Sequence, residues 1–341
     1  MSRSPGCGGG PARRARFDLG DGAALLVTTI WGVNFAFVKA TLMQFDVRAF
    51  TFLRFVGMVA LAWIVLASAR RMRRGSQGGV APSRADLGRL VIAGVVGHGA
   101  YQLLFVFGLQ STTAFSTALL LNTTPAFTSL LLWGLRLEAV ATVQWAATAV
   151  SFLGVLVFVY DKLRVGLASA GMGDLLSVLA ALCFAVYNVV NKPLLSRYPA
   201  TALTTYTLTI GAVPLLAVSL PGVVVQDWGR VSGLGWAGLL WSVVVPVYVA
   251  WTLWTWVSSR LGVARTATFI YVVPIVSAMA SWVLLGERFG ALKVAGALMV
   301  LGGLVIARAS APAAVPPRDP GPAPRAVRAA VSAASDGSGG G

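Results

Sequence analysis

The sequence predicts an all-α integral membrane protein with ten transmembrane helices, built as two inverted five-helix repeats. The first observation behind this prediction is composition: 57% of the 341 residues are hydrophobic, only 11% are charged, and the mean hydropathy is +0.78. Soluble domains carry about 25% charged residues. The other two observations are a series of apolar stretches long enough to cross a bilayer and a pattern of residues that occurs twice.

Helices that cross a bilayer need about 20 mostly apolar residues. Stretches of this length, separated by charges, prolines and glycines, predict ten spans: Gly22–Leu42, Val47–Ala67, Leu87–Leu109, Thr112–Gly134, Thr142–Tyr160, Gly173–Leu195, Ala202–Leu220, Gly235–Val257, Gly262–Leu285 and Ala291–Ala307. They assign residues 21–161 to a first five-helix unit and residues 172–308 to a second. The tails, 1–20 and 309–341, are rich in Pro, Ala, Gly and Ser, which predicts disorder because such segments bury little apolar surface.

The two units share a spaced set of residues. Adding 149 to a residue number in the first unit leads to the same residue type in the second, which pairs Pro125 with Pro274, Trp133 with Trp282, Leu135 with Leu284, Glu138 with Glu287, and Gly154 with Gly303. Two copies of one hydrophobic unit are typical of transporters whose halves move around a shared site. Because five helices are an odd number, the second copy enters the membrane upside down.

The placement of Lys and Arg predicts the orientation, since cytoplasmic loops are enriched in these residues. With both termini in the cytoplasm, 19 of the 27 Lys and Arg residues fall on the cytoplasmic side and 6 on the outer side, while Lys39 and Arg54 lie inside spans. This predicts a multi-pass protein of the cell (cytoplasmic) membrane, with the lipid bilayer as a partner. It also accounts for the net charge of +16 without nucleic acid as a partner.

Several short motifs resemble those of EamA-type carriers, which belong to the drug/metabolite transporter superfamily. The segment Trp31–Lys39 reads WGVNFAFVK and resembles the W-G-x-N-F-x-x-x-K signature that opens these carriers. The resemblance continues in Leu53–Phe55 and in Pro125–Val155, and it covers nearly the whole chain outside the tails. The second copy departs from the signature, with Phe184 in place of the tryptophan and Tyr187 in place of the asparagine.

The resemblance implies secondary transport of a small molecule, usually export, across the bacterial cytoplasmic membrane by alternating access. It leaves the cargo open between amino-acid-like metabolites and drugs, and the coupling open between a proton and an exchanged solute. A homodimer also stays open. A channel or scaffold without active transport is the alternative.

No enzyme, cofactor or metal site is expected. The sequence has a single histidine and lacks the H-E-x-x-H and G-x-S-x-G motifs. Cys7 and Cys183 lie in a tail and in an apolar helix, positions that suit neither a disulfide framework nor a metal.

Polar side chains near the middle of the spans are the candidate substrate-binding residues, because polar groups in hydrocarbon are costly unless they face a cavity or one another. At about 1.5 Å per residue, five of them lie at a similar depth. They are Asn34, His98, Asn122, Tyr187 and Asn188. This common depth predicts a site near the midplane.

The third predicted helix carries His98, Tyr101 and Gln102 on one face. They form either the wall of a cavity, with an imidazole that titrates near neutral pH, or interhelical hydrogen bonds. No Asp or Glu lies at the centre of a span, so His98 is the best available carrier if protons drive transport.

Charged residues near helix ends have simpler explanations. We expect Lys39 to reach the outer interface with its long side chain, and Glu138 and Glu287 to order loops or cap helices. Arg54 lies deeper, about 10 Å into the second span. Because its guanidinium stays charged, it either pairs with backbone carbonyls or binds an anionic group of the substrate.

Pro125 and Pro274 lie inside the fourth and ninth predicted helices, where a proline removes a hydrogen bond and kinks the chain. The two kinks either gate the site or serve packing. Trp251 and Tyr271 are candidates for an aromatic pocket, with ordinary packing or an interfacial belt as the alternative.

Overall fold

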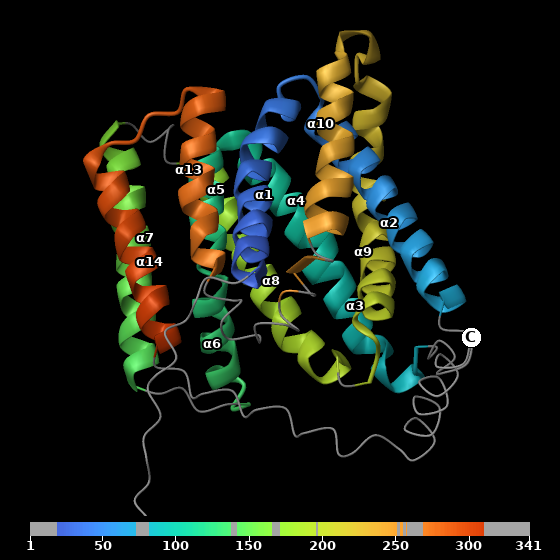
Figure 1. The fold of residues 1–341 in the computed structure, drawn as a ribbon, viewed down its shortest axis with the longest axis horizontal. Helices are drawn as coiled ribbons and strands as arrows, with labels where there is room; N and C mark the ends of the chain where they lie inside the picture. The colour runs from blue at the N-terminus through green and yellow to red at the C-terminus, as the bar shows by residue number, and fades with distance from the viewer. Residues whose placement is uncertain are drawn as a thin grey trace, which may run out of the picture. The chain divides into compact units, whose positions relative to one another are not determined.

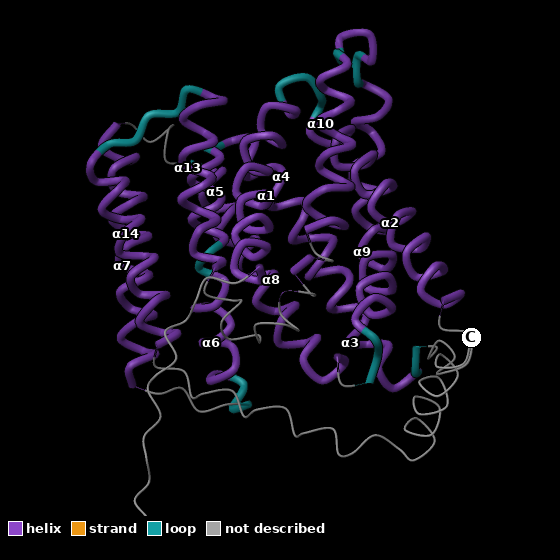
Figure 2. Tube along the Cα trace, viewed as in Figure 1, coloured by secondary structure: helices purple, strands orange, loops and turns teal. Residues whose placement is uncertain are grey.

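All regular secondary structure in the described part of the chain is helical, and Figure 2 shows these helices joined by short loops. The computed structural model describes residues 19–72, 82–137, 142–165, 171–195, 197–250, 253–254, 257 and 269–309. Trp251, Glu138 and most of both predicted tails lie outside these residues. Over the described ranges the all-α prediction is confirmed.

The first predicted unit contains seven α-helices and two other helical segments among the described residues. Their bounds are α1 (Leu19–Leu42), α2 (Val47–Met72), the 3-10 helix η1 (Arg84–Asp86), α3 (Leu87–Gly94), the π-helix η2 (Val95–Ala100), α4 (Tyr101–Ser111), α5 (Ala114–Leu121), α6 (Thr124–Gly134) and α7 (Thr142–Val165). The third predicted span is therefore one long helical segment with a π-helical insert at its middle.

The second predicted unit has a similar series. Its described elements are α8 (Met172–Leu195), α9 (Ala200–Val225), the 3-10 helix η3 (Trp228–Arg230), α10 (Gly233–Val244), the π-helix η4 (Val245–Val249), the 3-10 helix η5 (Phe269–Tyr271), α13 (Val272–Leu285) and α14 (Ala291–Ala309). Here too, a π-helix follows the helix that begins the eighth predicted span.

Six helical segments in the described ranges are long and apolar enough to cross a membrane: Leu19–Leu42, Val47–Arg71, Arg84–Ser111, Ala114–Gly134, Met172–Leu195 and Ala200–Val225. Shorter apolar helices cover Trp145–Phe158, Gly233–Val247, Phe269–Leu285 and Ala291–Gly303. Several spans are thus present, and the count of ten stays a prediction.

The positions of the two prolines differ from the predicted kinks inside continuous helices. The fourth predicted span is broken: α5 ends at Leu121, and α6 restarts with Pro125 in its first turn. Similarly, α13 begins at Val272 after a 3-10 helix, so Pro274 also lies in a first turn. A proline fits a first turn, where its missing N–H leaves no carbonyl unpaired. The roles of the two prolines in gating or packing stay predictions.

Helices from the two predicted units alternate within the bundle. In Figure 1, α1 lies beside α13, α2 beside α9, and α7 beside α14, and α4 packs on α8 in the same way. Small residues allow the backbones to approach closely. A Cβ added at Gly154 of α7 would lie 2.7 Å from the carbonyl oxygen of Gly296 in α14. The residues around the candidate site therefore come from both units.

Candidate functional site

Seven polar side chains among the described residues have buried atoms without a hydrogen-bond partner there, and three of the seven are sequence-predicted site residues. The atoms of these three are Asn34 Oδ1 on α1, Arg54 Nε on α2 and His98 Nε2 on η2. Asn34 and Arg54 are only 8% and 4% exposed. Because most buried polar groups in proteins are hydrogen-bonded, each such atom requires an explanation. All three residues were sequence-predicted candidates.

Arg54 and Gln102 are brought together from α2 and α4. The Arg54 Nη1 donates to Gln102 Oε1 at 3.1 Å, and both residues are buried. The guanidinium carbon lies 5.8 Å from the ring centroid of Phe105, a cation–π distance. Two roles were predicted for Arg54, pairing with backbone carbonyls and binding an anionic group of the substrate. Among the described residues Arg54 contacts the side-chain amide of Gln102 and the ring of Phe105, and no backbone carbonyl.

An aromatic column leads away from this pair through residues of α4, α8 and η2. Phe105 stacks on Tyr101 with 6.2 Å between centroids, and Tyr101 lies 5.1 Å from Phe184. Phe184 stacks on Tyr187 at 5.6 Å, and Tyr187 meets the His98 ring edge-on at 5.0 Å. The aromatic column therefore joins two predicted site residues of the first unit to one of the second.

Glycines around His98 explain how the column is assembled. A Cβ added at Gly97 would lie 2.3 Å from the Tyr187 ring, so only glycine leaves room for that ring. A Cβ at Gly99 would lie 3.0 Å from the carbonyl oxygen of Gly211 in α9. The π-helix η2 thus packs its backbone against α9 while its histidine points to the column. π-Helical inserts are frequent at functional sites.

Arg54 and its partner Gln102, called the Arg54 pair below, lie at the same level of the bundle as Asn34. At about 1.5 Å per residue, Arg54 is about 10 Å from the start of α2, Asn34 about 12 Å from the end of α1, and Gln102 about 13 Å from the end of α4. These ends lie together, because Lys39 near the end of α1 donates to the carbonyl oxygen of Leu109 near the end of α4 at 2.9 Å.

Lys39 caps the end of a helix. Its Nζ donates to the carbonyl oxygens of Leu109, Gln110 and Thr112, which follow one another where α4 ends and α5 begins. These are carbonyls that a helix end leaves unpaired. The sequence did not predict these partners, because it did not place a helix end against α1, and the expectation that Lys39 reaches the interface stays a prediction.

Contacts between the predicted units close the same end of the bundle. Glu287 Oε1 accepts a hydrogen bond from the backbone N of Ala114 at 2.8 Å, which caps α5 as predicted for this glutamate. Thr112 Oγ1 donates to Asp174 Oδ1 at 2.6 Å. Both carboxylates come from the second unit. Glu287 accepts from the first residue of α5, and Asp174 accepts from the loop before it.

Other predicted candidates lie apart from the Arg54 pair or are used locally. The Asn122 amide donates to the carbonyl oxygen of Ala118 in its own helix at 2.8 Å. Asn188 is exposed on α8. Tyr271 packs against a separate hydrophobic cluster that includes Phe115. Their roles in binding stay predictions, as does that of Trp251.

The candidate signature tryptophan makes a contact that sequence reasoning missed. Trp31 Nε1 donates to the carbonyl oxygen of Pro246 in η4 at 3.0 Å, and its ring lies 5.0 Å from that of Trp254. This links α1 to the second π-helix. The only signal in the sequence was the motif itself.

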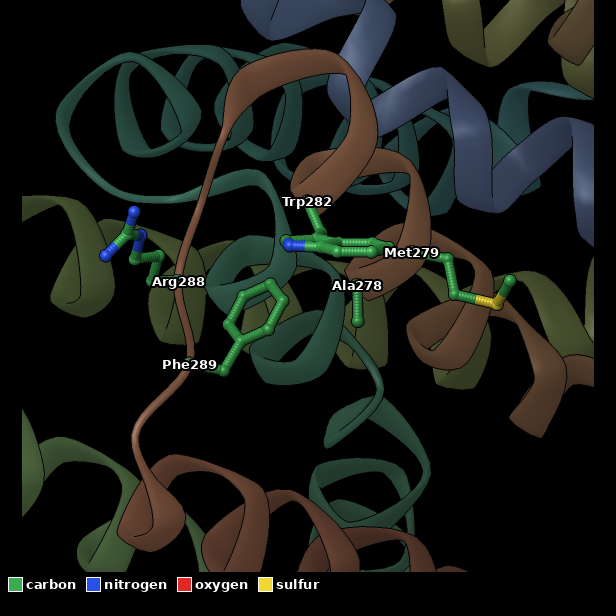
Figure 3. A pocket seen from close by; sticks show the side chains of 5 residues that line it. All are labelled: Ala278, Met279, Trp282, Arg288 and Phe289. Carbon is green, nitrogen blue, oxygen red and sulfur yellow. The ribbon is translucent and has the colours of Figure 1, made fainter.

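Two cavities open away from the buried pair. Figure 3 shows Trp282 and Phe289 facing one groove of about 680 Å³, with Arg288 at its side; Ala278 and Met279 complete its lining. Another, of about 600 Å³, lies among α3, α6 and α8. None of the sequence-predicted site residues lines either cavity.

Comparisons with known proteins agree with this architecture. The profile of the EamA-like transporter family matches residues 18–160 and 171–309. A "Probable terminal-alkyne amino-acid exporter" of Streptantibioticus cattleyicolor is 28% identical over 288 residues, which cover 83% of this chain and 91% of the relative. A "Probable amino-acid metabolite efflux pump" of Salmonella typhimurium is 26% identical over 294 residues, which cover 83% and 92% of the two chains.

A solved crystal structure superimposes with a TM-score of 0.54 at 16% identity, covering 84% of this chain and 97% of the other, a likeness that shows the fold alone. The family profile covers most of the chain, and the similar proteins are named as an exporter and an efflux pump. These findings point to a transporter rather than an enzyme, with a small-molecule substrate. The chain belongs to the EamA-like transporter family and is a multi-pass membrane transporter.

Proposed function

We propose that this protein is a secondary exporter of small amino-acid-like metabolites or drugs, working by alternating access across the cytoplasmic membrane with both termini inside. The observation that carries the proposal is the set of buried polar atoms on Asn34, Arg54 and His98 without partners among the described residues. Polar groups in a membrane interior are costly unless they are paired or face a cavity, and for this reason they commonly mark substrate paths. Their location between helices of both units is where a repeat-built carrier binds its cargo.

The backbone supports ten spans in two inverted repeats, with units at 21–161 and 172–308. The π-helices η2 and η4 begin at Val95 and Val245, 150 residues apart, which is one residue from the offset of the sequence repeat. The helices that contain Pro125 and Pro274 begin within two residues of each proline. Two copies that keep their irregularities at matching places suit a pair of hinges around one site.

Export and cargo rest on the names of similar proteins. One is named as an exporter of an alkyne amino acid and another as a pump for amino-acid metabolites. The aromatic column and the Arg54 pair suit a molecule with an apolar part and a polar head. A proton carried by His98, or an exchanged solute, supplies the coupling.

The test is transport by purified protein in liposomes. Vesicles are loaded with pooled labelled amino acids, sugars or cationic dyes, and efflux is followed with and without a proton gradient. We expect saturable flux of at least one pool, stimulated by the gradient and lowered by His98→Ala if the histidine carries the proton. Flux that never saturates would indicate a channel, and no flux of any pool would indicate a scaffold. Unchanged gradient dependence in His98→Ala would show that His98 does not carry the proton, and saturable flux that ignores the gradient would leave solute exchange as the coupling.

A further inference from the structure

We infer that Arg54 binds the carboxylate of the substrate and that Gln102 positions its guanidinium, while the aromatic column receives the apolar part of the same molecule. The inference rests on the proposed function and names a substrate class for it: monocarboxylates with an apolar or aromatic body. The sequence left open whether Arg54 is a structural or a substrate-binding arginine, and the inference assigns it to substrate binding.

The charge of Arg54 lacks compensation in the described part of the chain. Its side chain is buried, and the ion pairs formed by described residues join other arginines to Asp46, Asp86 and Asp227. A buried cation without a counter-charge is unfavourable by several kcal/mol in typical proteins. Arginine cannot lower this penalty by giving up its proton. A substrate anion that reaches Arg54 would supply the missing charge.

The geometry of the guanidinium leaves Nε for a ligand. Gln102 occupies Nη1 at 3.1 Å, whereas Nε has no partner among the described residues. In a guanidinium, Nε and Nη2 carry two parallel N–H donors, which match the two oxygens of a carboxylate. Gln102 accepts from the opposite side, so it fixes the plane of the guanidinium and does not occupy Nε. Gln102 is therefore a positioning residue.

The surroundings select the rest of the ligand. Phe105 lies 5.8 Å from the guanidinium carbon and begins the aromatic column, so an apolar group attached to the carboxylate meets rings rather than polar atoms. The single positive charge favours a monoanion over a phosphate dianion, for which one guanidinium gives incomplete compensation. The chemistry of these residues therefore suits a carboxylate joined to an apolar body.

The experiment compares acids with their amides. Unlabelled 3-phenylpropanoate and 4-methylpentanoate, which are monoanions with an apolar body, and the corresponding neutral amides compete with the labelled pool that the wild-type protein transports in liposomes. We expect the acids to inhibit at least tenfold better than the amides, because the amides lack the negative charge. Arg54→Gln is expected to remove this preference and Arg54→Lys to reduce it, since lysine keeps the charge but not the paired donors. Arg70→Gln is the matched control, an exposed arginine of the same helix that donates to the Tyr206 hydroxyl.

Gln102→Glu separates positioning from a general packing role. The new carboxylate would sit within reach of Arg54 and compete with the substrate. We expect a higher unfolding temperature together with at least a tenfold rise in KM for the acids and little change in maximal rate. Gln102→Asn keeps an amide, so its KM for the acids should lie between that of the wild type and that of Gln102→Glu. If Arg54→Gln does not fold, the Gln102→Glu and Arg54→Lys results still decide the question.

The outcomes distinguish this inference from the proposed function. Saturable transport with equal inhibition by acids and amides, or with the acid preference intact in Arg54→Gln, would overturn the carboxylate assignment and leave the exporter standing. Lower stability of Gln102→Glu with an unchanged KM would overturn the positioning role. The absence of flux for every pool would overturn the exporter and, with it, the assignment.

Discussion

Two adjacent glycines of α14 should respond to the same substitution with opposite signs. A Cβ added at Gly302 meets nothing within 4 Å. A Cβ added at Gly303 would lie 2.3 Å from Ser151 Oγ and 2.5 Å from the carbonyl oxygen of Ala147, both on α7. Since both glycines are in the same helix, the helix-forming preference of alanine is common to the two variants and only the contact with α7 differs.

The magnitude follows from these contacts. Alanine replaces glycine inside a helix with a gain of about 0.5–1 kcal/mol, which is the expected change for Gly302→Ala. At Gly303 the backbone carbonyl of Ala147 cannot move aside as a flexible side chain would, so α7 and α14 must separate. Overpacking of this kind costs about 1–3 kcal/mol, which exceeds the gain from helix preference. Because the helix term is common to both variants, they should differ in unfolding free energy by the overpacking cost alone, about 1–3 kcal/mol.

The measurement is reversible unfolding in mixed detergent and SDS micelles, followed by helical circular dichroism. Gly302→Ala should unfold at higher SDS fraction than the wild type, and Gly303→Ala at lower. If the two variants shift in the same direction by the same amount, the close packing of α7 on α14 is not a source of stability and the reasoning fails. Gly134→Ala, whose added Cβ also meets nothing within 4 Å, provides a second open-position control.

Two further predictions concern the closed end of the bundle. Lys39→Met removes charged hydrogen bonds to the carbonyls around the α4–α5 junction and should lower the unfolding free energy by about 2–3 kcal/mol in the same assay. Glu287→Gln weakens the cap of α5 at Ala114 and should cost about 1 kcal/mol, whereas Asp227→Asn, in an exposed pair, should change stability by less than about 0.5 kcal/mol. Equal effects of the three variants would contradict the assigned roles.

Composition, span length and motif order were sufficient to predict an all-helical membrane transporter of this family. These properties can be read locally, because each span is defined by its own apolar residues and does not depend on contacts with other helices. Individual side chains were harder to place. Arg54 was chosen as a charge inside a span and Gln102 for its place on the His98 face of its helix, but their hydrogen bond depends on how α2 meets α4, and no local pattern encodes that.

Backbone irregularities were the main source of error. The break between α5 and α6 and the π-helix η2 change where side chains point, yet each depends on packing against other helices as much as on the residues involved. Lys39 illustrates the consequence: its sequence position suggested an interfacial anchor and did not reveal that it caps the helix end at Ser111. The partners of a helix end are set by tertiary contacts, so a single sequence predicts them poorly.

The irregularities and the side chains behave differently between the two predicted units. The π-helices η2 and η4 and the helix starts at both prolines fall at matching positions. By contrast, His98 matches Val247 at the repeat offset of 149. The W-G-x-N-F signature aligns with the second unit at an offset of 153, which matches Asn34 with Tyr187. A carrier that works by alternating access needs similar hinges in both units, because each unit must open and close in turn. It needs only one substrate site, so the polar groups that bind cargo are free to occur once. The combination of shared backbone breaks and unshared polar side chains is therefore what the proposed mechanism requires.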